Sequence, residues 1–310
     1  MALRGLPNPV NTCYLNATLQ CLMHTRAFRK VLLVFGDDLN ITTLLFSGKR
    51  NLNYHSIYKH MLIQAQKMLK PLHLAEFNDA GETMIRLLDW YHEKGLRTRL
   101  PSQEIFRSKW MSDMNHMSDV HFMKSNSIIA DQFFMKQFVN TVCGGCGHIN
   151  TNFEYLSVLH VVAKSYCLKD AIFDYFKPEY VPDWICDRCN KKHHNSTRTP
   201  HLWTTGSVVV IVIESAWFEN GAVVKNKHDV RVEDALYLHP FVVHPKAPRS
   251  FRLRSVCTHH GDAYYGHYTA SIRKDDLWTL YDDDKVTTQR TVRSPYMLFY
   301  ESLDTIESNP

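Results

Sequence analysis

A cysteine near the N-terminus, Cys13, has the residue type and the placement of a nucleophile. It follows a turn-rich segment with two prolines (5–12), and apolar residues recur after it at helical spacing, so we expect it at the start of a helix. The positive end of a helix dipole lowers the pKa of a thiol, and free backbone N–H groups there can hold an oxyanion. By placement alone, Cys13 could equally be a small buried apolar residue like Cys21.

A second segment supplies a candidate base. A glycine-bearing loop (260–267) delivers His267 to the start of an expected strand, which holds an imidazole rigidly. The next expected strand ends in three aspartates (282–284), and a carboxylate across such a hairpin can accept the imidazole Nδ1–H and fix the tautomer. We interpret His259 and His260 as ordinary core or solvent histidines. The pattern indicates a Cys-His-carboxylate arrangement.

Four further cysteines form two Cys-x-x-Cys pairs, Cys143 with Cys146 and Cys186 with Cys189. Four thiolates at this spacing make a closed tetrahedral zinc site, which contributes folding free energy and needs no open coordination position. The segment between the pairs (147–185) is longer than a compact zinc ribbon and suits two hairpin tips brought together. Free buried thiols are the alternative, but with all four ligands present we predict one structural Zn²⁺ per chain.

The elements that position these residues change in type near residue 131. Helical spacing predicts helices from about 12, over 54–69 and over 78–92, and a short later helix over 168–176. Beta-rich segments dominate the second half: 133–142, 153–162, 207–213, 251–258, 267–273, 277–281 and 296–301. Helices first and strands later are typical of an α+β fold.

Composition excludes several classes of protein. The 310 residues are 45% apolar and carry a net charge of +5, which favours a folded core and gives no indication of nucleic-acid binding. The longest aliphatic run (208–213) is far too short to span a membrane, and the N-terminus lacks an apolar signal core. We therefore expect a soluble, non-exported protein whose eight cysteines are not disulfide-bonded.

Two regions resemble the ubiquitin-specific proteases, a family of papain-like cysteine proteases. The segment 5–22, with Asn-Thr-Cys-Tyr-Leu-Asn and Leu-Gln-Cys-Leu, resembles their Cys box, and the segments 251–273, 278–286 and 296–300 resemble their His box. The resemblance implies a single catalytic domain over 1–310 with thumb, palm and zinc-bearing fingers. The expected subdomains are a mainly helical thumb at 1–130, fingers at 131–230, a palm at 231–302 and a frayed tail at 303–310.

The resemblance implies a role for each matching residue of the catalytic site. Cys13 matches the nucleophile, His267 the general base and Asp282 the third member of the triad. Asp283 matches a neighbouring aspartate with a supporting role. Asn8 matches the side chain that donates into the oxyanion hole.

The segment 78–82 resembles the family's Gln-Asp-x-x-Glu box. Asp79 and Glu82 lie three apart on an expected helix, hence on one face, and two carboxylates suit the arginine of ubiquitin's Leu-Arg-Gly-Gly tail. Tyr268 matches an aromatic residue that lines the tail cleft. Without the resemblance, Asp79 and Glu82 are better interpreted as acids that complement a helix dipole.

Four features depart from the family pattern. Val10 occupies a position that is usually glycine, and a β-branched residue is badly suited if the backbone there needs a positive φ. The segments 77–78, 81–83 and 214–218 also differ from the usual residues. These changes touch none of the triad positions, but they leave the preferred modifier and the rate of turnover open.

The resemblance implies a thiol-dependent deubiquitinase that cleaves after the last glycine of ubiquitin through a thioester. We expect ubiquitin or ubiquitinated proteins as partners, no nucleic acid or membrane, a monomer, and an intracellular location in cytoplasm or nucleus. Because the two boxes span nearly the whole chain, we expect targeting to come from the core surface or from a partner. The alternatives are a protease for another Gly-Gly-ended modifier and a ubiquitin-binding pseudoenzyme with weak catalysis.

Overall fold

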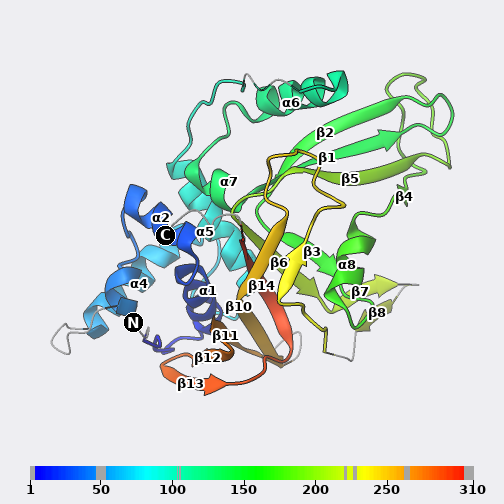
Figure 1. The fold of residues 1–310 in the computed structure, drawn as a ribbon. Coiled ribbons are helices and arrows are strands. Elements are labelled where there is room, and N and C mark those ends of the chain that lie inside the picture. Colours follow the sequence, from blue (N-terminus) through cyan, green and yellow to red (C-terminus); the bar gives the residue numbers. More distant parts are fainter. Residues whose placement is uncertain are drawn as a thin grey trace.

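The N-terminal part of the chain folds into helices that gather on one side of the molecule (Figure 1). The computed structural model describes residues 4–46, 54–102, 104, 106–219, 222–225, 229–261 and 266–303. The predicted helices near 12, 54–69 and 78–92 are confirmed, whereas α2, α3, α6 and α7 were not predicted. The helices are α1 (Cys13–Met23), α2 (Arg26–Phe35), α3 (Ile41–Phe46), α4 (Tyr54–Met68), α5 (Ala80–Lys94), α6 (Lys109–Phe122) and α7 (Ile128–Phe133).

Helix α1 is buried along its whole length. Its apolar side chains join one core with α5 on one side and with strands of the largest sheet on the other. The polar residues Asn16, Thr18 and Gln20 are buried too, and each donates a hydrogen bond to a backbone carbonyl. The helix that begins with Cys13 is therefore fixed by tertiary contacts on every face.

The largest sheet of the described chain has eight strands and carries His267 and Asp282, two of the residues predicted to be catalytic. Four strands that follow one another between residues 250 and 289 pair as antiparallel hairpins, as predicted for the hairpin that carries His267 and Asp282. The last strand of the sheet along the chain lies between the first of these four and a strand from the middle of the chain, and the strand at the far edge pairs in parallel. The order of the sheet is β13 (Lys285–Gln289), β12 (Leu277–Asp282), β11 (Gly266–Lys274), β10 (Ser250–Gly261), β14 (Pro295–Ser302), β6 (Val208–Glu214) and β3 (Leu159–Val162), and β9 (Ala235–Tyr237) pairs with β10.

Strand β6 is apolar from Val208 to Ile213 because both faces of this sheet are covered. Val208, Val210 and Val212 pack with the N-terminal helices, whereas Val209 and Ile211 pack on the opposite face with α8 (Leu168–Tyr175). A strand buried on both faces has no polar side to alternate with. The continuous run seen in the sequence is therefore a central strand.

A smaller sheet extends away from α1, and α6 packs against it through Met114 and Phe122 (Figure 1). The predicted strand over 153–162 is two strands in different sheets, and the first part of the predicted strand over 133–142 is the end of α7. The strand order of the smaller sheet is β2 (Ile149–Leu156), β1 (Met135–Val142), β5 (Thr197–Thr204) and β4 (Glu179–Tyr180). A separate pair consists of β7 (Ala216–Glu219) and β8 (Ala222–Lys225). Strands β4, β5, β7, β8, β9 and β13 were not predicted.

The α+β class is confirmed, with a helical thumb, a large palm sheet and a finger sheet. The subdomain boundaries stay a prediction, but the sheets do not follow them: β3 and β6 lie within 131–230 and yet belong to the larger sheet. The predicted frayed tail lies outside the described residues except for Leu303. Among the helices that the structure describes, none combines the length and the apolar character that a bilayer crossing requires.

Candidate active site

Cys13 is the first residue of α1, as predicted, and its side chain is buried. Burial raises the pKa of the thiol, and the negative charge of Asp283 adds to this, whereas backbone N–H groups, foremost that of Tyr268, lower it. The net pKa shift is upward, so the prediction that the helix dipole brings the thiol toward neutrality is wrong: desolvation outweighs the helix terminus. A thiol held in this way needs a base beside it.

His267 lies at the start of β11, one residue before Tyr268, whose backbone N–H contacts the Cys13 thiol. Its Nε2 lies 2.6 Å from Oδ1 of Asp282 on the adjacent strand β12. Because an ionised carboxylate only accepts, Nε2 carries the hydrogen and Nδ1 is the basic nitrogen. The predicted pairing of the aspartate with Nδ1 is therefore wrong, and Nδ1 is the ring nitrogen that does not contact Asp282.

Asp283 connects the two halves of the site. Its Oδ2 accepts a hydrogen bond from Asn8 Nδ2 at 3.0 Å, and its Oδ1 accepts one from Asn16 Nδ2 at 2.8 Å. Its backbone carbonyl accepts from the N–H of Leu6 at 2.8 Å. A Cβ at Gly5 would lie 2.3 Å from the same carbonyl oxygen, so only glycine permits this approach. The N-terminal segment is thus held against the turn that follows Asp282.

Asn8, the predicted oxyanion donor, is held at both ends of its amide. Its Oδ1 accepts from the backbone N–H of Thr12 at 2.6 Å and from the Thr12 hydroxyl at 3.2 Å, while its Nδ2 donates to Asp283. These contacts fix the turn that leads into Cys13. Donation into an oxyanion hole stays a prediction.

Asn16 and Tyr58 complete this network, and neither was predicted as a site residue. The hydroxyl of Tyr58, on α4, lies 3.1 Å from the hydroxyl of Thr12 and donates to Oδ1 of Asn16 at 3.4 Å. Asn16 could have been found, because a residue three after Cys13 on a helix lies on the same face. The sequence near Tyr58 carries no such signal.

Val10 does not have the positive φ that a glycine at this position could adopt. The left-handed residue of this loop is Asn11, with φ of 58°, and asparagine tolerates that region better than most residues. The side chain of Val10 is 40% exposed, on the surface next to the start of α1. The substitution of the usual glycine therefore strains no left-handed backbone.

The predicted tail-binding residues lie together at the start of α5. Asp79 caps the helix by accepting from the N–H of Glu82 at 2.8 Å, which matches the helix-start interpretation. Its other oxygen accepts from the hydroxyls of Tyr268 at 3.2 Å and Tyr296 at 2.5 Å. Glu82 forms an ion pair with Arg86, one turn on, at 2.6 Å. The two carboxylates share a turn, but each already has its own protein partners.

Tyr296, on β14, was not predicted as a site residue. Burial and the charge of Asp79 raise the pKa of both tyrosines, so their hydroxyls stay protonated as donors. A Cβ at Gly81 would lie 3.0 Å from the Tyr296 hydroxyl. The small residue at this helix position therefore allows β14 to approach α5 closely.

The four cysteines of the two pairs meet at the far end of the smaller sheet. The Sγ atoms of Cys143 and Cys189 lie 3.8 Å apart, those of Cys146 and Cys186 lie 3.7 Å apart, and all four lie within 4.8 Å of one another. Metal–sulfur bonds of about 2.3 Å at a tetrahedral centre place the sulfurs about 3.8 Å apart. The four thiols are thus positioned to bind one metal ion.

The surroundings of this cluster also fit a metal site. His193 Nε2 lies 3.6 Å from Sγ of Cys189, and a Cβ at Gly145 would lie 2.2 Å from the His193 ring. The glycine in the first knuckle thus makes room for this histidine beside the thiols. All eight cysteines of the chain are described, and all are free rather than disulfide-bonded.

Comparison with known families agrees with this geometry. The model of the family described as ubiquitin carboxyl-terminal hydrolase matches residues 4–300, nearly the whole chain. The chain belongs to the ubiquitin carboxyl-terminal hydrolase family. The resemblance to ubiquitin-specific proteases that the two boxes indicate is therefore confirmed.

Curated relatives in this family are longer than the chain. Ubiquitin carboxyl-terminal hydrolase 23 of Arabidopsis thaliana is 25% identical over 324 residues, which cover 96% of this chain and 35% of the relative. Ubiquitin carboxyl-terminal hydrolase 21 of Homo sapiens is 26% identical over 345 residues, covering 96% of this chain and 61% of the relative. The chain thus spans between about a third and three fifths of these two hydrolases.

Solved structures of SAGA DUB modules contain a chain with the same fold. A chain of the SAGA Ubp8/Sgf11/Sus1/Sgf73 DUB module bound to ubiquitin aldehyde aligns with a TM-score of 0.74 at 18% identity, covering 97% of this chain and 69% of that one. The module with Ubp8(C146A) bound to monoubiquitin gives 0.73 at 19% identity, covering 97% of this chain and 69% of that one. The architecture is therefore that of a known hydrolase fold.

Proposed function

We propose that the chain is a thiol-dependent deubiquitinase that hydrolyses the isopeptide or peptide bond after the last glycine of ubiquitin. The observation that supports this most directly is the 2.6 Å contact between His267 Nε2 and Asp282 Oδ1, on the strands beside the helix that begins with Cys13. Membership of the ubiquitin carboxyl-terminal hydrolase family supports the substrate class.

In this proposal His267 Nδ1 takes the proton of the Cys13 thiol as the sulfur attacks the carbonyl carbon of the modifier's last glycine. The negative charge moves to the carbonyl oxygen, which backbone N–H groups at the start of α1 and the Asn8 amide stabilise. The C–N bond breaks and the amine leaves with the proton from His267. Water, deprotonated by His267, then hydrolyses the thioester. Asp282 keeps the imidazole in the required tautomer throughout.

Recognition of the modifier's tail is proposed to take place at the start of α5. Asp79 and Glu82 place negative charge beside the strand that carries His267, which suits an arginine-bearing tail. The hydroxyls of Tyr268 and Tyr296 hold the Asp79 carboxylate in one orientation. A tail that ends in two glycines has no side chains to clash with these rings.

We propose that the four-cysteine site holds one Zn²⁺ and that its role is structural. Four thiolates satisfy a tetrahedral zinc ion with no open position for water, so the ion supplies folding free energy and no catalytic chemistry. Cys143 and Cys146 would join one turn of the finger sheet to the turn that carries Cys186 and Cys189. A fixed tip supports the finger sheet as a surface for the folded body of ubiquitin.

We further propose that the protein acts as a monomer on ubiquitinated proteins in the cytoplasm or nucleus. Eight free cysteines, four of them gathered as metal ligands, suit a reducing compartment.

The test is a side-by-side assay of modifiers that carry a fluorescent amide at the C-terminus. Wild-type protein should release the fluorophore from ubiquitin with a higher kcat/KM than from other Gly-Gly-ended modifiers, and Cys13→Ser should release none. Cys21→Ser, a buried cysteine on the same helix, is the matched control. Preference for another modifier would replace ubiquitin as the substrate, and tight binding with no turnover of any modifier would contradict the enzymatic proposal.

A further inference from the structure

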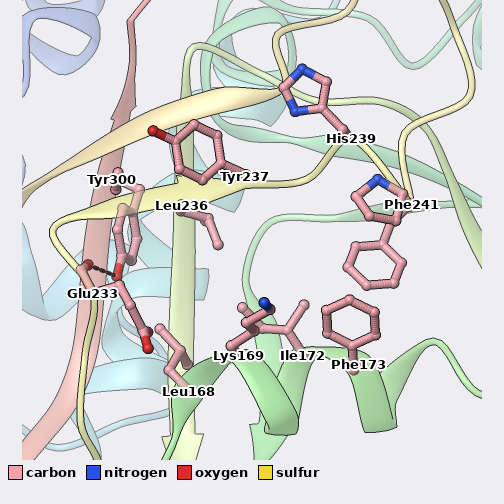
Figure 2. Close-up of a pocket in the computed structure, with 12 residues that line it drawn as sticks. Leu168, Lys169, Ile172, Phe173, Glu233, Leu236, Tyr237, His239, Phe241 and Tyr300 are labelled. Atoms are coloured by element: carbon pink, nitrogen blue, oxygen red, sulfur yellow. Dashed lines mark hydrogen bonds between the residues drawn. The ribbon is translucent and has the colours of Figure 1, made fainter.

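A cavity on the far side of the large sheet lies outside the catalytic site. It has a volume of about 450 Å³ and lies between α8 and β9 (Figure 2). On β14, Met297 and Phe299 face the core that contains α1, whereas Leu298 and Tyr300 face the core that contains α8. Tyr300 lines the cavity, so the sheet separates this space from Cys13. A ligand here would leave the catalytic cleft free.

The strand that borders the cavity has one unpaired edge. In the described part of the chain, β9 pairs with β10 alone, in an antiparallel register that places Leu236 opposite Phe251. The ladder bonds involve the carbonyl of Asp234 and the N–H of Leu238. Because antiparallel bonding alternates, the intervening residues 235 and 237 direct their backbone N–H and C=O groups away from β10, toward the cavity side. Such an edge is a template for an added strand.

The cavity wall is mainly apolar and aromatic. Ile172 and Phe173 of α8 and Leu236 of β9 line it, and Figure 2 shows these side chains converging from the two elements. Phe241 closes one end, with its ring 4.9 Å from that of Phe173. The volume lies within the range of about 300–1,000 Å³ that is usual for ligand pockets. An apolar side chain that enters from the strand edge would be buried here.

The charges at the rim favour an acidic partner. The Lys169 ammonium lies 5.8 Å from the centre of the Phe173 ring and forms no ion pair with any residue that the structure describes. The opposite rim carries Glu233, but Arg231 lies 3.6 Å from its carboxylate and the Cys167 thiol donates to it at 3.2 Å. Lys169 is therefore the charge without a counterpart.

We propose that an extended segment of a partner protein binds here by adding a strand to β9. Its backbone would pair with residues 235 and 237, one leucine- to phenylalanine-sized side chain would fill the cavity, and an acidic residue would face Lys169. Backbone pairing supplies affinity in this mode of recognition, and the side-chain pocket supplies specificity. The site is a docking surface that holds a partner while the cleft on the other face stays accessible.

The test separates backbone pairing from side-chain contact at one position. A phage-displayed library of random ten-residue peptides is panned against the full chain, and the selected peptides are then tested on Tyr237→Pro, which removes only the outward N–H and leaves the ladder with β10 intact. Tyr237→Thr, which keeps the N–H, is the matched control. The best peptide is labelled with fluorescein, and its Kd is measured for each variant by anisotropy.

We expect selected peptides with an apolar and an acidic residue and a Kd at least tenfold weaker for Tyr237→Pro, with less than a threefold change for Tyr237→Thr. Lys169→Glu should weaken binding at least threefold, whereas Lys109→Glu, on the exposed face of α6, should not. The backbone amides of residues 235 and 237 should exchange more slowly with peptide bound. If Tyr237→Pro does not fold, the Kd for Lys169→Glu and the amide exchange decide.

Three results would overturn the proposal. Peptides that bind wild type and Tyr237→Pro equally would show that the strand edge is not used. Amide exchange at residues 235 and 237 that the peptide leaves unchanged would place the peptide elsewhere. A wild-type dimer in sedimentation that Tyr237→Pro converts to a monomer would assign the edge to a second copy of this chain.

Discussion

The four-cysteine cluster and the catalytic cleft are assembled in different ways. Each half of the cluster is one turn, Cys143 with Cys146 and Cys186 with Cys189, and the two turns lie at the end of one small sheet. The cleft instead joins segments from opposite ends of the chain: Asn8 contacts Asp283 across 275 positions. The Cys-x-x-Cys spacing along the chain determines the geometry of the cluster, whereas the packing of the large sheet against α1 determines the geometry of the cleft.

This difference has an energetic consequence. Backbone and side-chain hydrogen bonds hold the two cysteine turns, and a metal ion bound by the four thiols would add folding free energy to the finger tip. The cleft is held by buried side-chain contacts between the entry segment and the turn after β12, so its geometry depends on single hydrogen bonds. Damage to one site should therefore leave the other largely intact.

The largest effect is expected from loss of a metal ligand. Structural zinc contributes an apparent binding free energy of about 10–16 kcal/mol in isolated zinc-finger peptides, so Cys186→Ser should abolish metal binding and expose the finger tip. We expect about one zinc per wild-type chain and none in the variant by atomic absorption, with fast amide exchange around 143–146. Cys167→Ser, outside the cluster, should keep the metal. If Cys186→Ser altered Cys13 alkylation as strongly as amide exchange at the finger tip, the two sites would not be independent.

The next largest effect is expected at the base. His267→Ala should lower kcat/KM on ubiquitin amide by about 10⁴-fold or more, because the thiol then has no proton acceptor. Its stability toward urea should change little, since the imidazole is 39% exposed. His260→Ala is the matched control, because His260 is exposed and opposite His267 in the β10–β11 register. A drop of less than tenfold for His267→Ala would exclude it as the base.

Asp283→Ala tests whether the connection between the two halves matters. The change leaves the amides of Asn8 and Asn16 without their shared acceptor, and hydrogen bonds to charged groups contribute about 1.5–3 kcal/mol. We expect a loss of about 2–3 kcal/mol in the free energy of unfolding and about 100-fold in kcat/KM. The exposed neighbour Asp284→Ala should change neither. Loss of activity with unchanged stability would argue for direct participation in the chemistry instead.

The pKa of Cys13 makes a prediction about pH. Because burial raises that pKa, the thiol is protonated near neutral pH, and alkylation by iodoacetamide should rise through a midpoint above about 8.5, the value of a free cysteine. At pH values below the pKa of the unfolded-state thiol, the raised pKa contributes fully to the stability of the fold. This contribution is lost as the pH rises through the folded-state pKa. A midpoint below 8 would instead indicate a preformed thiolate–imidazolium pair.

The smallest effect is expected from Tyr268→Phe. The change removes one hydroxyl that donates to Asp79 and keeps the backbone N–H that contacts Cys13, so one hydrogen bond of about 1 kcal/mol is lost. We expect KM to rise a few-fold with kcat nearly constant. Tyr180→Phe, on an exposed finger strand, should change neither constant. A large fall in kcat would mean that Tyr268 positions His267 as well as the tail of the modifier.

The comparison also shows how much the sequence could predict. Residue types and order were sufficient for Cys13 at a helix start, for His267 beside Asp282 and for the cysteine cluster, because each depends on local pattern or on one hairpin. The ring nitrogen of His267 could not be predicted, since its orientation depends on how β11 and β12 pack against α1. The partners of Asn8 could not be predicted either, because they lie at the other end of the chain.

The balance of opposing effects was a second limit. The helix N-terminus at Cys13 was predicted, but the depth of its burial was not, and burial determines the direction of the pKa shift. Asp79 and Glu82 were placed on one helix face correctly, but Arg86 and Tyr296 give each carboxylate its own partner. The spacing of residues along the chain does not predict tertiary contacts of this kind.

In the proposed function, Cys13 is the nucleophile that attacks the C-terminal glycine of ubiquitin. The most direct test is covalent capture by ubiquitin with an electrophile at its C-terminus, followed as a gel shift for wild type, Cys13→Ala and Cys13→Ser. Wild-type protein should shift by one ubiquitin mass, and neither variant should shift. No shift in folded, zinc-loaded wild-type protein, or a shift that persists in Cys13→Ala, would contradict this proposal.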